Sequence, residues 1–163
     1  MGLQHWVRRK RYEAKVAAYR QHGGQPLRLA HAIHHMGDVH REAGQAALAE
    51  PCYSEALALY HSQKETSPLD LANAIRGLAV LKEEAGEFEY AARLWQEARD
   101  LYAAVDVAPG IAESAARLAL SAKRRGDVQR AREWLDEASV AAERAGDSES
   151  LEYVREVQAA IEK

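Results

Sequence analysis

Cysteine is nearly missing from this chain of 163 residues. Cys52 is the only one, so no disulfide can form within the chain. Such a chain suits a reducing compartment, and we expect it to be cytoplasmic. No apolar run approaches the roughly 20 residues that span a bilayer, so no membrane partner is expected. Only four Pro and ten Gly are present, which excludes collagen-like and low-complexity chains.

An excess of positive charge is missing too. The formal net charge of -3 excludes a globally basic protein, so nucleic acid is not an expected partner. The charge is nevertheless unevenly distributed, because residues 1–28 hold seven Lys and Arg against one acid. The run Arg8-Arg9-Lys10-Arg11 forms the centre of this segment. It could be an arm for an acidic partner, a helix that docks on the acidic body of a second copy, or a solvated face.

What the chain does have is a repeat. Residues 26–44, 68–86 and 111–126 are similar in sequence, at offsets of 42 and then 40 residues. Ala, Leu, Glu and Arg are abundant, which is a helical composition. Each copy ends in a glycine, which suits a left-handed helix C-terminus; these are Gly44, Gly86 and Gly126. The repeat therefore predicts a helix in each copy, followed by a tight turn.

A second helical pattern follows each of these glycines. Residues at spacings of 4, 3 and 4 lie on one helical face, and they alternate small with large side chains so that neighbouring helices can approach closely. The sets are Ala49, Tyr53, Ala56 and Tyr60; Ala91, Trp95, Ala98 and Tyr102; and Ala131, Leu135, Ala138 and Ala142. Short turns then predict antiparallel helix pairs.

The ends of these helices also have sequence signals. Ser67 and Pro68 form an N-cap followed by a proline at the first helical position. Asp127 can cap the helix that starts near Val128. Pro51 lies a few residues into the helix expected from about Ala46, so we expect that helix to start later, with Pro51 in its first turn.

This set of residues resembles the motif of the tetratricopeptide repeat (TPR) family. Repeat one supplies Met36, Gly37, Gly44, Ala49, Tyr53 and Ala56; repeat two supplies Leu78, Ala79, Gly86, Ala91, Trp95 and Ala98; repeat three supplies Leu118, Ala119, Gly126, Ala131, Leu135 and Ala138. The period of 40–42 residues exceeds the usual 34 of the family, and the early Trp and the closing Pro of the motif are missing. The chain is thus similar to the long-period variants of the family and to small bacterial TPR proteins.

The resemblance implies an all-α fold, a right-handed superhelix of antiparallel helix-turn-helix repeats with about eight helices. We expect a single repeat domain over residues 1–163. Its parts are an N-terminal partial repeat or capping helix at 3–21, repeats at 26–63, 68–105 and 109–145, and a capping helix at 149–162. Polar terminal helices are what stacked repeats need.

The resemblance also implies a function. First helices of TPR repeats line a concave groove, and their groove positions contact a protein or peptide partner. Those positions are His31, His34, Asp38, Arg41, Asn73, Arg76, Glu83, Glu113, Arg117 and Lys123. They are polar and mixed in sign, which favours a non-enzymatic interaction scaffold. Alternatively, Arg76 and Arg117 simply pair with Asp38 and Glu113 and keep the surface solvated.

Two further hypotheses stay open. All seven histidines lie in residues 1–61, and His31, His35 and Asp38 on the His-rich helix 31–40 could bind a divalent metal. Arg76 would repel a cation there, so no metal and no other cofactor is expected, and a pH-sensitive interaction is more plausible. The chain could also self-associate through its terminal helices, as a homodimer for example. No catalytic motif is present, so we do not expect an enzyme.

Overall fold

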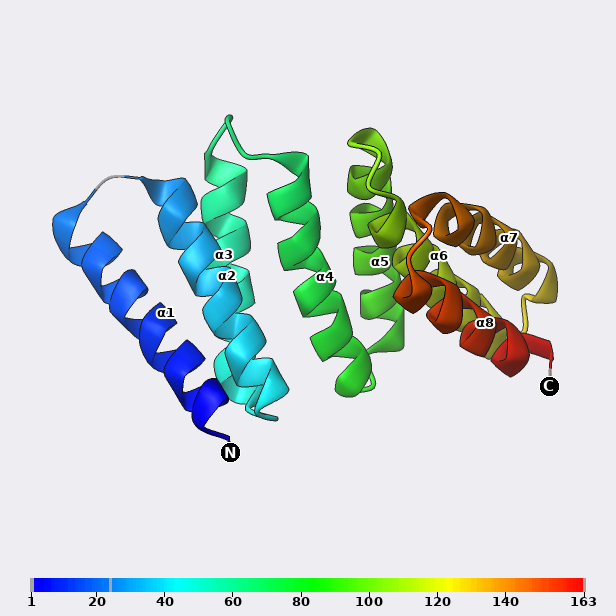
Figure 1. The fold of residues 1–163 in the computed structure, drawn as a ribbon, viewed down its shortest axis with the longest axis horizontal. Helices are drawn as coiled ribbons and strands as arrows, with labels where there is room; N and C mark the ends of the chain where they lie inside the picture. The colour runs from blue at the N-terminus through cyan, green and yellow to red at the C-terminus, as the bar shows by residue number, and fades with distance from the viewer. Residues whose placement is uncertain (1, 24, 163) are drawn as a thin grey trace. The chain divides into compact units, whose positions relative to one another are not determined.

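The structure, a computed structural model, describes residues 2–23 and 25–162, and every regular element within them is an α-helix. The helices are α1 (Leu3–His22), α2 (Pro26–Glu42), α3 (Ala46–Ser62), α4 (Pro68–Glu84), α5 (Phe88–Ala104), α6 (Ala108–Arg124), α7 (Val128–Ala145) and α8 (Ser148–Glu162). The predicted all-α fold of helix-turn-helix repeats is confirmed (Figure 1). Among these described helices, none is long and apolar enough to cross a membrane.

The helices form two compact units, α1–α4 and α5–α8, which divide between Ala85 and Gly86. In the first unit, α2 and α3 make an antiparallel pair, α1 packs on α2, and α4 packs on α3 (Figure 1). In the second unit, α6 and α7 make the corresponding pair, α5 packs on α6, and α8 lies against both α6 and α7. The expectation that residues 1–163 act as a single domain stays a prediction.

The turns follow the predicted glycines. Each has a positive φ, which costs an L side chain energy but not glycine; the φ values are 70° at Gly44, 78° at Gly86 and 77° at Gly126. The N–H of Gly44 donates to the carbonyl of Arg41 at 2.8 Å and so satisfies one of the last carbonyls of α2. The glycines therefore end one helix and let the next begin at once.

The predicted N-caps are also confirmed. The Ser67 side chain accepts a hydrogen bond from the backbone N–H of Leu69, and Pro68 is the first residue of α4. The Asp127 side chain accepts from the backbone N–H of Arg130 at the start of α7. These side chains satisfy donors that have no partner inside the helix.

The core consists of the predicted small–large faces. In α3, Ala49, Tyr53, Ala56 and Tyr60 are each 1% exposed or less. In α5, Trp95 is the largest fully buried side chain. An alanine on either side of each aromatic ring lets a neighbouring helix come close enough to pack on it.

The late start expected for the helix with Pro51 is wrong. α3 begins at Ala46, and Pro51 lies inside it. The missing N–H of Pro51 costs the bond to the carbonyl of Ala47, which lies in the exposed first turn, where water can replace it. A proline is tolerated here because the helix is interrupted close to its solvated end.

Replacing Pro51 by alanine is expected to raise the free energy of unfolding by about 1 kcal/mol. A proline in a helix interior costs about 3 kcal/mol, and a site one turn from the end costs less. Urea unfolding followed by circular dichroism measures the change. Pro26→Ala, at the first position of α2, is the matched control and should change little. A Pro51→Ala variant no more stable than Pro26→Ala would contradict this account.

Candidate functional site

The predicted groove residues of the first unit lie on α2 and α4, at different depths. His31 is exposed, and Asp38 and Arg41 are half-buried. His34 is only 4% exposed, so its ring lies beneath the surface and contacts the ring of Tyr53. On α4, the half-buried groove residues each make a contact within the chain; these are Asn73, Arg76 and Glu83.

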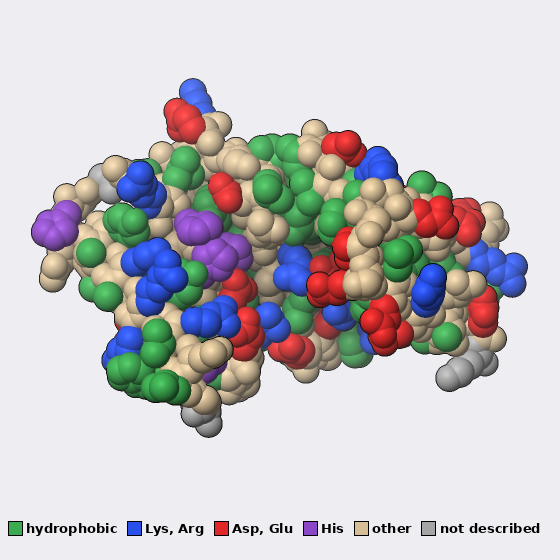
Figure 2. All heavy atoms as spheres, viewed as in Figure 1, with side chains coloured by type: hydrophobic (Ala, Val, Ile, Leu, Met, Phe, Trp, Pro, Cys, Tyr) green, Lys and Arg blue, Asp and Glu red, His purple; other side chains and the backbone are tan. Residues whose placement is uncertain are grey.

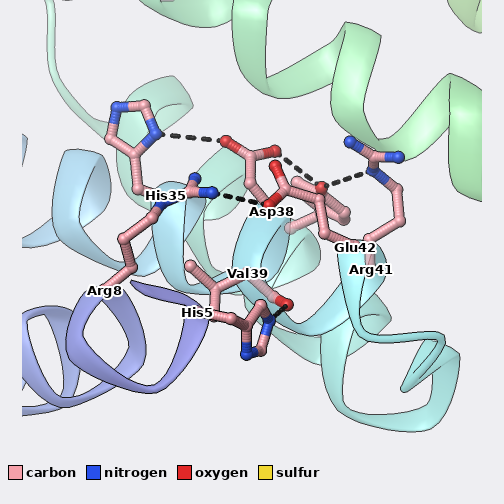
Figure 3. A network of polar contacts seen from close by, with 8 residues as sticks. His5, Arg8, His35, Asp38, Val39, Arg41 and Glu42 are labelled. Atoms are coloured by element: carbon pink, nitrogen blue, oxygen red, sulfur yellow. Dashed lines mark hydrogen bonds and ion pairs between the residues drawn. The ribbon is translucent and has the colours of Figure 1, made fainter. Parts of the chain in front are cut away.

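Asp38 is the centre of a hydrogen-bond network on this face (Figure 3). Its carboxylate lies 3.1 Å from Nδ1 of His35 and accepts a 2.7 Å hydrogen bond from the hydroxyl of Tyr53. Nε of Arg41 donates to the same hydroxyl at 3.4 Å. Burial alone would raise the pKa of Asp38, but the bonds from His35 and Tyr53 and the nearby imidazoles hold it below its usual value.

Tyr53 therefore has two functions. Its ring fills the space between helices, and its hydroxyl fixes the carboxylate of Asp38. Burial, together with the charge of Asp38, raises the pKa of Tyr53, so the hydroxyl stays protonated and donates. The repeat pattern predicts the ring of Tyr53 in the core, but not the hydrogen bond, because the other repeats have Trp95 and Leu135 at this position.

The three histidines of α2 lie together but are badly arranged for a metal ion. His31, His34 and His35 have ring nitrogens within 4.8 Å of one another. The rings of His34 and His35 are stacked, with centroids 4.6 Å apart and planes only 17° apart. An imidazole binds a metal along a lone pair in the plane of its ring, so two nearly parallel stacked rings cannot both point at one ion. The ring geometry therefore gives no support to the metal hypothesis.

A cavity of about 310 Å³ opens beside His31, between α1, α2 and the start of α4. Its lining is aromatic and charged: Tyr12, Lys15, Tyr19, Leu27, Arg28, His31, Ala32 and Asp70. Figure 2 shows histidine side chains gathered beside Lys and Arg side chains on this face. Sequence reasoning missed the residues of α1, although the offset of 42 that aligns α1 with α3 places it beside α2.

The predicted groove residues of the second unit lie on α6 and are engaged by their neighbours. The guanidinium carbon of Arg117 lies 5.5 Å from the ring centre of Trp95 and 5.3 Å from that of Tyr153, and Arg117 pairs with Glu113 at 3.9 Å. Nζ of Lys123 donates to the carbonyls of Ala160 and Ile161 at the end of α8. The pairing of Arg117 with Glu113 is thus confirmed, and these side chains hold α8 against α6.

No protein-family model matches the sequence, and no curated protein is similar to it at a significant level. Several solved structures are similar in fold. BtubC (BKLC) from P. vanneervenii is 21% identical with a TM-score of 0.75, over 98% of this chain and 66% of that one. Aspartyl phosphate phosphatase F from Bacillus subtilis is 14% identical with a TM-score of 0.86, over 97% of this chain and 41% of that one.

A kinesin light chain-like protein with TPR-like repeats, from Podosopora anserina, is 19% identical with a TM-score of 0.70. The match covers 96% of this chain and 88% of that one. The chain thus spans less than two thirds of BtubC and of the phosphatase, and most of the repeat protein. At these identities the likeness concerns the fold, and it agrees with the helix pairs and turn glycines described above. The chain has the architecture of a TPR-like helical-repeat protein.

Proposed function

We propose that the chain is a non-enzymatic scaffold for protein–protein interaction, and that α2 and α4 of the first unit bind a peptide or protein segment. The observation that carries the proposal is the polar face built around Asp38. Asp38 is fixed by His35 and Tyr53, and His31 borders the cavity of about 310 Å³. A polar surface that is already ordered loses less conformational entropy when a partner binds.

The chemistry of the cavity indicates the kind of segment it accepts. Lys15 and Arg28 outnumber the single acid, Asp70, and Tyr12 and Tyr19 offer ring faces. An acidic side chain next to an apolar or aromatic one would complement these groups. Glu113, Arg117 and Lys123 are left out of this surface, because their contacts with α8 already serve the second unit.

A scaffold without catalysis agrees with the state of the one cysteine. Cys52 is buried, and burial raises the pKa of its thiol. A thiol held protonated in this way is a poor nucleophile. This fits a structural residue in the cytoplasmic protein that we propose.

Selection from a displayed random peptide library, with the purified chain as bait, tests the binding surface. Asn73→Ala combined with Arg76→Ala is expected to weaken the selected peptides at least tenfold, about 1.4 kcal/mol, in fluorescence anisotropy. Arg132→Ala combined with Glu143→Ala, at exposed positions of α7, is the matched control. Peptides that bind the groove variant as tightly as the wild type would show that the surface lies elsewhere.

A further inference from the structure

The outer face of α1 is uncovered where the same face of α3 is buried. At the offset of 42 residues, positions 7, 11, 14 and 18 of α1 correspond to Ala49, Tyr53, Ala56 and Tyr60, which α2 covers. In α1 these positions are all exposed; they hold Val7, Arg11, Ala14 and Ala18. Leu3 and Trp6 continue the same face and are 77% and 51% exposed. α1 is thus a second helix of a repeat with no first helix on it.

Contacts within the first unit support this alignment. Arg8 of α1 pairs with Glu42 at 2.6 Å, and Glu50 of α3, 42 residues later, pairs with Lys82 at 2.6 Å. Both bonds reach the last turn of the first helix that follows, α2 in one case and α4 in the other. α1 therefore packs on α2 in the way that α3 packs on α4.

α8 has the complementary form. At a further offset of 40 residues, positions 152, 155, 156 and 159 correspond to Ala112, Ala115, Ala116 and Ala119 of α6, which are 1% exposed or less. In α8 these positions are exposed and hold Glu152, Arg155, Glu156 and Ala159. Together with Ser148 and Leu151 they line a shallow depression of about 580 Å³. α8 is thus a first helix of a repeat with no second helix on it.

The charges of the two helices are opposite. α1 holds six Lys and Arg against one Glu, and α8 holds four Glu against one Arg. On the uncovered faces, Arg11 of α1 would take the place of Tyr53, and Glu152 and Glu156 of α8 would take the place of alanines. Oppositely charged faces of this kind favour pairing with each other over pairing with themselves.

We propose that α1 of one copy docks on α8 of a second copy, so that the two half-repeats make the helix pair that α2 and α3 make within the chain. Such an interface is head-to-tail, so each copy keeps one free end and association can continue. A single polar helix pair buries little area. We therefore expect weak association, on the order of 10–100 μM, that salt weakens further.

The alignment also predicts which residues meet. Ala159 corresponds to Gly37, and Lys10 corresponds to Cys52. A Cβ placed on Gly37 would lie 3.2 Å from the Cβ of Cys52. The Cβ atoms of Lys10 and Ala159 from two copies should therefore be close enough for a disulfide between cysteines at these positions.

Two variants, each with one end of the interface neutralised, test the proposal by sedimentation. The first carries Lys10→Gln and Arg11→Gln, and the second carries Glu152→Gln and Glu156→Gln. Each alone should be monomeric where the wild type associates, and an equal mixture should form only 1:1 dimers. Self-association of the second variant alone would show that α1 pairs with α1 and would overturn the proposal. A wild type that stays monomeric at 1 mM would overturn it too.

Disulfide trapping tests the register. Chains with Lys10→Cys and chains with Ala159→Cys, each with Cys52→Ser, should form a covalent heterodimer on oxidation. The pair Gln21→Cys and Ala159→Cys, exposed but out of register, is the control and should cross-link at least tenfold more slowly. Equal rates would overturn the proposed register. Binding of the wild type to anionic lipid vesicles without self-association would assign the face of α1 to a membrane surface and would also overturn the proposal.

Discussion

Replacing Gly77 by alanine is expected to lower the free energy of unfolding by about 3 kcal/mol. A Cβ on Gly77 would lie 2.5 Å from Cε1 and 2.8 Å from Cζ of Tyr53, a ring that is fully buried and cannot simply move aside. A displaced ring would also break the hydrogen bond that Tyr53 donates to Asp38. These losses exceed the roughly 1 kcal/mol that alanine gains over glycine in a helix.

Gly37→Ala is the matched control for this prediction. A Cβ on Gly37 would meet the same ring at 3.1 Å, and the corresponding positions in the next two repeats hold Ala79 and Ala119. Its cost in urea unfolding should therefore stay below about 1 kcal/mol. Tyr53→Leu should also recover part of the loss in the Gly77→Ala background, because the shorter side chain leaves room for the new methyl group. Equal costs for Gly77→Ala and Gly37→Ala would contradict the steric argument.

The fold could be predicted because local signals and the repeat agree. The offset of 42 residues aligns two copies of a helix pair, and Gly44 and Gly86 mark the turn in each. Agreement between spacing, turn residues and the buried face of α3 leaves few other folds for the sequence. Pro51 was misplaced because its sequence signal is the same whether a helix starts late or tolerates a proline near its exposed end.

The site could be predicted only in part, because a residue's face on a helix does not give its depth. The spacing places His34 on the same side of α2 as His31, but the packing of α2 on α3 buries the ring of His34 against Tyr53. Sequence spacing likewise gives Lys123 a groove position, while the structure turns its amine to the end of α8. Such differences depend on tertiary contacts, which one helix does not encode.

Lowering the pH from 7 to 4 is expected to cost the fold about 3 kcal/mol at His34 alone. Burial lowers the pKa of His34 from 6.5 to about 4; the neighbouring His35, His31 and Arg76 lower it further, and Asp38 opposes them. The unfolded chain therefore binds a proton at His34 below pH 6.5, while the folded chain resists it until about pH 4. This part of the stability is present above pH 6.5 and is lost as the pH falls through that window.

His34→Phe is the variant that isolates this effect, because it keeps a buried ring and removes the titrating group. Nδ1 of His34 has no hydrogen-bond partner among the described residues, so the substitution leaves no donor or acceptor unpaired there. The stability of the variant should fall less than that of the wild type between pH 7 and pH 4, by about 3 kcal/mol, in urea unfolding at each pH. A wild type whose His34 titrates near 6.5 by NMR while still folded would contradict the prediction.

The same titration should act unevenly on the chain. His34 and its neighbours lie on α2 and α4, so protonation places a charge inside the first unit, beside the ring of Tyr53. The second unit has its own core around Trp95 and contains no histidine. Hydrogen exchange near pH 4.5 should therefore show α2 and α3 losing protection before α6 and α7 in the wild type, and His34→Phe should reduce the difference. Simultaneous loss in both units would mean that they unfold as one cooperative body, with the cost of His34 shared between them.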